Sequence, residues 1–235
     1  FIREVGICLF FREAFDPAKI PVLFVHGALG TPLGWANIVE RIDSARFQPW
    51  FYYYPSGLSL ETNSAALNWM VNHLQRHYGF KELYVVAHSM GGLVARSFIL
   101  KNRYESDQGI VRRFVSISSP WNGHKLTAKG VRQAPTAVPS WHDMVPDSPF
   151  IRSVFARRLP ASVIYDLLFS YRGDCNLFLE NNDGTVELSS ELDQRAQREA
   201  RRIYGYDEDH GSILTSADTL ADLVRLLSAP ASSPQ

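Results

Sequence analysis

The chain has 235 residues, of which 46% are hydrophobic, so it can bury one sizeable core and we expect a single domain over residues 1–235. Lysine and arginine together number 24, as do aspartate and glutamate, so the charge balance favours neither a nucleic-acid partner nor broad contact with an anionic membrane. No apolar run is long enough to predict a membrane-spanning helix.

Neither the N-terminal residues nor the cysteines identify the cellular compartment of the protein. The first residue is Phe1 rather than methionine, and no signal peptide is visible. We therefore expect that a native start has been removed and that the protein is extracytoplasmic or membrane-associated, although no motif identifies the compartment or the oligomeric state. Cys8 and Cys175 match no metal-binding spacing and are expected to be small buried residues, with pairing left open.

Strands and helices alternate in the first part of the chain. Apolar and aromatic runs predict strands at residues 5–11, near an edge of the sheet, and at 21–25 and 47–54. Apolar residues at helical spacing predict helices over 35–42 and 61–78.

The alternation continues with a strand at 83–86, a helix over 90–104 and a strand at 110–118. This order favours an α/β fold, with a mostly parallel sheet and helices on both of its faces. In such sheets the functional site lies beyond the carboxyl ends of the strands.

The segment 126–160 is the least regular part, with prolines at 135, 139, 146, 149 and 160. Within it, Ser148 followed by Pro149 predicts the cap and first turn of a short helix. Residues 163–171 predict a strand, although residues 162–168 also allow a helix. The remaining elements are a turn at 181–184, a strand at 201–206 and a helix over 215–227.

A short stretch joins a predicted strand to a predicted helix through one serine, Ser89. Residues 83–93 read Leu-Tyr-Val-Val-Ala-His-Ser-Met-Gly-Gly-Leu. A sharp strand-serine-helix turn requires small residues two positions before and after the serine, and Ala87 and Gly91 meet this requirement. Such a turn raises the serine hydroxyl above the sheet and points the Met90 amide to where an oxyanion would form. We therefore predict a nucleophilic serine at Ser89.

Three motifs resemble those of the α/β-hydrolase superfamily, in particular small bacterial lipases and esterases. One is Ala-His-Ser-Met-Gly-Gly at 87–92, with alanine in the first glycine position. The segment 21–30, Pro-Val-Leu-Phe-Val-His-Gly-Ala-Leu-Gly, is similar to the family's His-Gly loop, while 182–186 and 209–211 are similar to its acid and base segments. The resemblance implies the α/β-hydrolase fold and places a second oxyanion donor at the amide of Ala28.

A serine hydroxyl needs an imidazole to take its proton and a carboxylate to orient that imidazole. His210 is the best base, because it lies in a loop after a predicted strand and no other histidine follows residue 142. His88 neighbours Ser89 on a strand, so it points to the opposite face and is expected to pack. Asp183 and Asp174 compete for the role of the acid. We favour Asp183, because Asp-Gly-Thr-Val resembles the acid segment of lipases.

This constellation predicts a serine carboxylic-ester hydrolase, a lipase or an esterase, that acts through an acyl-enzyme. The expected partner is a small-molecule or lipid ester, with a lipid interface as a further candidate, and no metal or organic cofactor is required. His73 and His77 lie one helical turn apart without an evident third ligand, so we expect a solvated or interfacial face. The alternatives are an acyltransferase or phospholipase on the same triad, or a non-catalytic lipid or partner binder.

We also expect a cap or lid insertion at about 121–160, a basic and aromatic segment. The short helix predicted after Ser148 has an apolar face, with arginines at 152, 157 and 158 beside it. This face would form either a mobile cover that opens at a lipid surface or a fixed scaffold. Five side chains would accordingly line an acyl pocket or simply pack the insertion on the core, and the sequence leaves both alternatives open: Trp121, Trp141, Met144, Phe150 and Phe155.

Overall fold

A computed structural model describes residues 6–105, 109–133, 138–173 and 180–230 of the protein. Within these ranges one seven-stranded sheet has the order β1-β3-β2-β4-β5-β6-β7. Only β1, at the edge, pairs antiparallel with its neighbour, which confirms the predicted fold class. The strands are β1 (Cys8–Phe11), β2 (Ile20–Val25), β3 (Phe47–Tyr53), β4 (Leu83–His88), β5 (Val111–Ile117), β6 (Ile164–Ser170) and β7 (Arg202–Tyr206).

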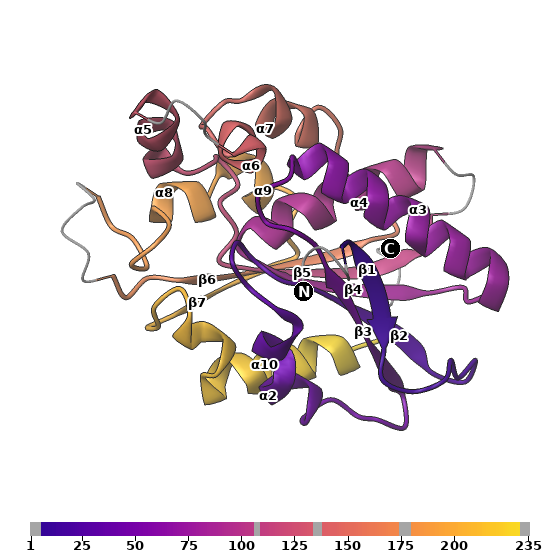
Figure 1. The fold of residues 1–235 in the computed structure, drawn as a ribbon. Coiled ribbons are helices and arrows are strands. Elements are labelled where there is room, and N and C mark those ends of the chain that lie inside the picture. The colour runs from indigo at the N-terminus through magenta and orange to yellow at the C-terminus, as the bar shows by residue number, and fades with distance from the viewer. Residues whose placement is uncertain (1–5, 106–108, 134–137, 174–179, 231–235) are drawn as a thin grey trace.

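Helices cover both faces of the sheet (Figure 1). The helices α2 and α10 lie on one face, while α3, α4 and the shorter helices α5 to α9 lie on the other. The helical elements are η1 (Pro32–Trp35), α2 (Ala36–Val39), α3 (Leu60–Tyr78), α4 (Met90–Glu105), α5 (Lys125–Gln133), α6 (Pro139–Asp143), α7 (Pro149–Val154), α8 (Leu188–Glu191), α9 (Gln194–Gln197), η2 (Ser212–Leu214) and α10 (Ala217–Ser228).

The central strands β2 and β4 are almost wholly apolar because both of their faces are buried. In β2, Leu23 and Val25 belong to the core cluster on the α3/α4 face, whereas Val22 and Phe24 belong to the cluster on the α2/α10 face. The alternation follows from the two-residue period of a strand. A continuous apolar run such as 21–25 is therefore the expected sequence of a central parallel strand.

The order of the strands fixes where a site can form. From β2 the chain moves outward to β3, and then returns past β2 to β4 and continues in the opposite direction to β7. The order thus reverses between β2 and β4, which pair directly from Val22 with Tyr84 to Val25 with Ala87. Ligands of open α/β sheets bind in the crevice at such a reversal, beyond the carboxyl ends of the strands.

The structure corrects two expectations about helices. The helix predicted over 35–42 is a 3-10 turn followed by the short α2, so it is shorter than its apolar spacing suggested. The segment 126–160, expected to be the least regular part, contains α5 and α6 in addition to the predicted helix, α7. Its prolines do not break these helices, because Pro139 and Pro149 stand in the first turns of α6 and α7, where the missing N–H costs nothing.

Other expectations hold as stated. Ser148 caps α7, since its Oγ accepts a hydrogen bond from the N–H of Ile151 at 3.1 Å. Residues 164–170 form a strand rather than a helix, and this strand lies between β5 and β7. The last predicted strand and helix correspond to β7 and α10.

Candidate active site

Ser89 sits in the turn that joins β4 to α4. Its φ is 54°, a left-handed value that costs a non-glycine residue about 1–3 kcal/mol. The surrounding structure holds it there: its N–H donates to the carbonyl of Ile117 on β5 at 2.8 Å, and its carbonyl accepts from the N–H of Gly92 at 2.9 Å. The expected strand-serine-helix turn is therefore present.

Glycines around the serine allow three backbone segments to approach closely. A Cβ at Gly27 would lie 2.8 Å from the Cβ of Ser89, and one at Gly91 would lie 2.4 Å from the carbonyl oxygen of His26. A Cβ at Gly92 would lie 2.0 Å from the Oγ of Ser119. The loop after β2, the start of α4 and the end of β5 can thus meet at this point because these glycines have no Cβ atom.

Gly91→Ala should therefore disrupt the turn. The added methyl group would meet backbone oxygens, which cannot move aside like the end of a side chain, so we expect a loss at the upper end of the about 1–3 kcal/mol typical of overpacking. Thermal denaturation measures this loss. Gly34→Ala is the matched control, since its Cβ would meet nothing within 4 Å. Equal melting temperatures for the two variants would contradict this account of the turn.

The structure brings the three predicted side chains into one hydrogen-bonded relay. The Oγ of Ser89 lies 2.8 Å from Nε2 of His210, and Nδ1 of His210 lies 2.5 Å from Oδ2 of Asp183. The backbone joins the same two segments, because the N–H of His210 donates to the carbonyl of Asp183 at 2.9 Å. In this arrangement Nδ1 carries a proton and Nε2 can accept one from the serine.

Asp183 is fully buried, yet its environment favours the ionised form. Burial alone would raise the pKa of this carboxyl, but hydrogen bonding to His210 and the charge of that ring, with the N–H groups of Val186 and Thr185, lower it to about 2. The hydroxyl of Ser170 also donates to Oδ2 at 2.8 Å. The competing acid, Asp174, lies outside the described residues.

His88 fixes the position of the loop that carries His210. Burial and the neighbouring ring of His210 lower the pKa of His88 to about 3, so it is neutral at neutral pH. Its Nε2 lies 2.9 Å from the carbonyl oxygen of His210 and must therefore donate the proton. The expected packing role thus includes a specific hydrogen bond, which sequence analysis did not foresee.

The loop after β2 presents the second predicted oxyanion donor. His26 stacks on Tyr54, whose hydroxyl donates to the carbonyl of His26 at 2.6 Å, and Nδ1 of His26 donates to the carbonyl of Gly27 at 2.8 Å. These contacts hold the loop beside the serine. Within the described residues we find no protein acceptor for the N–H of Ala28 or of Met90, so both donors are available to a substrate oxygen.

A second carboxyl group, which the sequence did not reveal, lies behind Asp183. Glu191 of α8 is 1% exposed, and its Oε2 accepts a hydrogen bond from the N–H of Ser170 at 3.3 Å. The hydroxyl of Ser118, a residue with a strained φ of 45°, lies 2.6 Å from that of Ser170. No motif marks Glu191, because only the folded chain brings α8 to the end of β6.

The residues predicted to line an acyl pocket mostly pack in the core. Trp121, Met144 and Phe150 belong to the core cluster on the α3/α4 face. Phe155 lies between the guanidinium groups of Arg96 and Arg195, at 4.4 and 4.5 Å from the ring centre.

Much of this segment is buried against the core. The apolar face of α7, formed by Phe150, Ile151 and Val154, is buried, and α7 lies against α4. Trp141 differs, because it is partly exposed on α6, where a Cβ at Gly130 would lie 2.9 Å from its ring.

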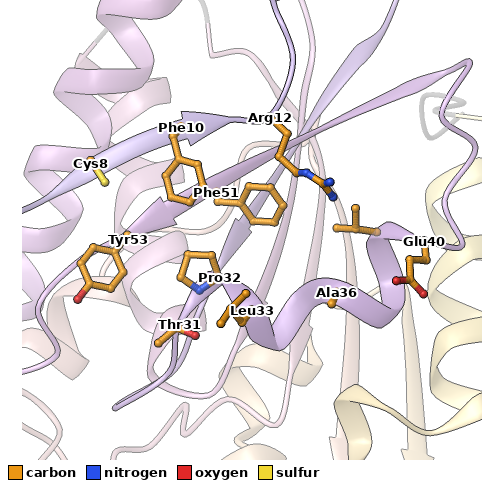
Figure 2. Close-up of a pocket in the computed structure, with 11 residues that line it drawn as sticks. Cys8, Phe10, Arg12, Thr31, Pro32, Leu33, Ala36, Glu40, Phe51 and Tyr53 are labelled. Carbon is orange, nitrogen blue, oxygen red and sulfur yellow. The ribbon is translucent and has the colours of Figure 1, made fainter. Parts of the chain in front are cut away.

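A separate apolar groove of about 840 Å³ lies beyond the loop that follows β2. Figure 2 shows Phe10 of the edge strand β1 and Phe51 of the adjacent β3 facing Pro32 and Leu33 of η1. Residues of β1, β3, η1 and α2 line this groove. Its lining includes none of the relay residues, so the groove is not the place where their chemistry would occur.

The described residues also bear on metal binding, membrane spanning and the cysteines. No group of three or more histidine, cysteine, aspartate or glutamate side chains among them could hold a metal ion. His73 instead stacks on Trp69, with ring centres 5.7 Å apart. No described helix combines the length and apolar character that crossing a membrane requires. Cys8 is half-buried, whereas Cys175 lies outside the described residues.

Comparison with known proteins agrees with this fold. The family model "Alpha/beta hydrolase of unknown function (DUF915)" matches residues 57–143, which include β4, Ser89 and α4. Sequence comparison with curated proteins gives no match.

Solved structures match over nearly the whole chain. The product of gene lin2722 from Listeria innocua is 17% identical, with a TM-score of 0.67 over 90% of this chain and 95% of that one. The mature lipase BlEst2 of Bacillus licheniformis is 20% identical, with a TM-score of 0.70 over 95% and 98% of the two chains. Phospholipase PlaB of Legionella pneumophila is 11% identical, with a TM-score of 0.69 over 90% and 60%. At such identities the likeness concerns the fold.

Proposed function

We propose that this chain, an α/β hydrolase by its fold and its family match, is a serine carboxylic-ester hydrolase that forms an acyl-enzyme on Ser89. The observation that carries the proposal is the relay of two hydrogen bonds from Ser89 through His210 to Asp183. Supporting observations are the strained backbone of the serine and the amides of Ala28 and Met90, which have no protein acceptor within the described residues. Strain of this kind persists where the surrounding structure enforces it, and it concentrates at functional sites.

In the proposed reaction, Oγ of Ser89 attacks the ester carbonyl while Nε2 of His210 takes its proton. The N–H groups of Ala28 and Met90 stabilise the oxyanion of the tetrahedral intermediate. The alcohol then leaves with the proton from His210. A water molecule, deprotonated by the same ring, attacks the acyl-enzyme and releases the acid. Asp183 stays ionised throughout and stabilises the imidazolium.

Exposed apolar side chains on the loop after β2, and beside the residues that contact this loop, support an ester with an apolar chain as the substrate. Leu29 follows the oxyanion donor Ala28 and is 94% exposed, with its N–H held by the hydroxyl of Ser56 at 2.9 Å. Val138, partly exposed, lies against the neighbouring Gly57. Apolar side chains exposed together at a site favour lipophilic ligands.

A panel of p-nitrophenyl esters of rising acyl length, beside triglyceride and phospholipid emulsions, tests the proposal. We expect ester cleavage that increases with acyl length, and covalent attachment of a fluorophosphonate to Ser89 as detected by mass spectrometry. Phospholipid cleavage would identify a phospholipase, and transfer to an added alcohol an acyltransferase, on the same triad. Absence of both cleavage and labelling would leave the non-catalytic binder as the better hypothesis.

A further inference from the structure

Glu191 is a buried carboxyl group for which the described residues supply no cationic partner. It is nine-tenths or more buried, it belongs to no ion pair within the described residues, and its Oε1 accepts no hydrogen bond there. By contrast, the buried Asp166 pairs with Arg113 at 3.0 Å, and Glu199 pairs with Arg96 at 2.7 Å.

Ser170 places Glu191 beside the acid of the relay. The N–H of Ser170 donates to Oε2 of Glu191 at 3.3 Å, while its hydroxyl donates to Oδ2 of Asp183 at 2.8 Å. One residue at the end of β6 therefore holds both carboxyl groups.

Two neighbouring carboxyl groups without a cation between them do not both ionise. Asp183 receives hydrogen bonds from Thr185, Val186, Ser170 and His210, so it is the member that keeps the charge. Burial, then the charge of Asp183 and the hydrogen bond between the two side chains, raise the pKa of Glu191 well above its usual value. The hydrogen bonds from Ser170 and Ser118 oppose this rise and are weaker.

We propose that Glu191 is a neutral positioning residue that donates a hydrogen bond from its carboxyl group to the Asp183 carboxylate. The proton on Glu191 occupies the space between the two carboxyl groups, and the bond keeps Asp183 turned toward His210. It also withdraws negative charge from Asp183, so Glu191 limits how strongly the acid stabilises the protonated ring. This inference rests on the proposed function for its effect on the reaction, but not for the protonation of Glu191.

The first experiment measures protonation without any substrate. In wild-type protein labelled with carbon-13 at the glutamate carboxyl groups, NMR at neutral pH should show one carboxyl signal at the protonated position. This signal should be absent from Glu191→Gln. A wild-type spectrum in which every glutamate is ionised would overturn the proposal, and this result needs no variant that folds.

The second experiment follows the rate of Ser89 labelling by a fluorophosphonate against pH. Glu191→Gln replaces the O–H donor by an N–H donor and stays neutral. The midpoint of the acid limb, which is the pH at which the labelling rate has fallen to half on the acid side, should therefore not move. Glu191→Met keeps the size of the side chain but removes the donor. Asp183 then stabilises the protonated relay more strongly, and the midpoint should rise by about half a pH unit or more.

Glu199→Gln is the matched control, since it neutralises a carboxyl group that pairs with Arg96 rather than with Asp183. Its midpoint should equal that of the wild type, whatever its thermal stability. A lower midpoint in Glu191→Gln would mean that Glu191 carries a charge, and an unmoved midpoint in Glu191→Met would mean that it does not act on the relay; either overturns the proposal. If wild-type Ser89 is not labelled at all, the proposed function fails, and the NMR spectrum still decides the state of Glu191.

Discussion

Ser89→Ala is expected to lower ester turnover by about a millionfold, the scale seen when the nucleophile of a hydrogen-bonded triad is removed. The Oγ atom is the only atom lost, and it is the atom that lies 2.8 Å from Nε2 of His210. Initial rates on the most reactive p-nitrophenyl ester, together with fluorophosphonate labelling, measure the effect. A variant with near-wild-type rates would show that another group forms the acyl-enzyme.

Ser89→Gly separates this loss from any change in folding. Glycine adopts a φ of 54° without strain, so this variant should be as inactive as Ser89→Ala but more stable by about 1 kcal/mol. Chemical denaturation of both variants provides the comparison. If glycine brought no gain over alanine, the backbone at this turn would carry no appreciable strain.

Asp183→Asn is expected to lower turnover by about a thousandfold to ten-thousandfold while leaving the fold intact. The amide N–H of the asparagine can donate a hydrogen bond to Nδ1 of His210, and this favours the tautomer in which Nε2 carries the proton and cannot accept one from Ser89. The measurement is kcat and KM on one soluble ester. We expect the loss in kcat, because the orientation of the ring matters for the reaction more than for substrate binding.

Two aspartates serve as controls for Asp183→Asn. Asp209 is next to His210 in the sequence, but its carboxylate accepts from the N–H groups of Gly211 and Ser212 and lies 3.9 Å from Arg172. Asp209→Asn should therefore reduce kcat far less. Asp174→Asn should also have a small effect, and a large loss there with little change in Asp183→Asn would assign the acid to Asp174.

Acid conditions offer a further check on Asp183. Its folded-state pKa of about 2 lies below the ordinary value of 3.8, so its ionisation stabilises the folded protein fully above that ordinary value. The contribution is lost as the pH falls through the interval down to about 2. Acid unfolding of Asp183→Asn should lack this part of the pH dependence. A wild-type and a variant curve of the same steepness would contradict the lowered pKa.

Much of the fold followed from local patterns, because β2 and β4 are almost wholly apolar and α3 carries apolar residues at helical spacing. The strand at 21–25 and the helix at 61–78 are correct to within a residue of β2 and α3. In the segment 126–160, the helix that begins at Pro149 was predicted correctly, whereas α5 and α6 were not predicted. Prolines can end a helix or begin one, and the sequence of Pro139 and its neighbours does not show which of these happens.

The site was predictable where backbone geometry dictates residue type. The turn at Ser89 needs small neighbours, so Ala87 and Gly91 identified it. Glu191 was not predictable, since a buried glutamate in a short helix looks like any exposed glutamate until α8 meets the end of β6. The choice between Asp183 and Asp174 likewise rested on resemblance, because both follow the same strand.

The strand order also determines when the relay can assemble during synthesis. The serine turn is complete once β5 has emerged, because the N–H of Ser89 donates to Ile117 at the end of that strand. Asp183 and His210 follow β6 and β7 respectively, near the end of the chain. A chain synthesised only as far as β5 therefore has the serine but neither of the side chains of its relay. The hydroxyl of Ser89 gains its hydrogen-bond partner only after β7 and the loop that follows it have been added.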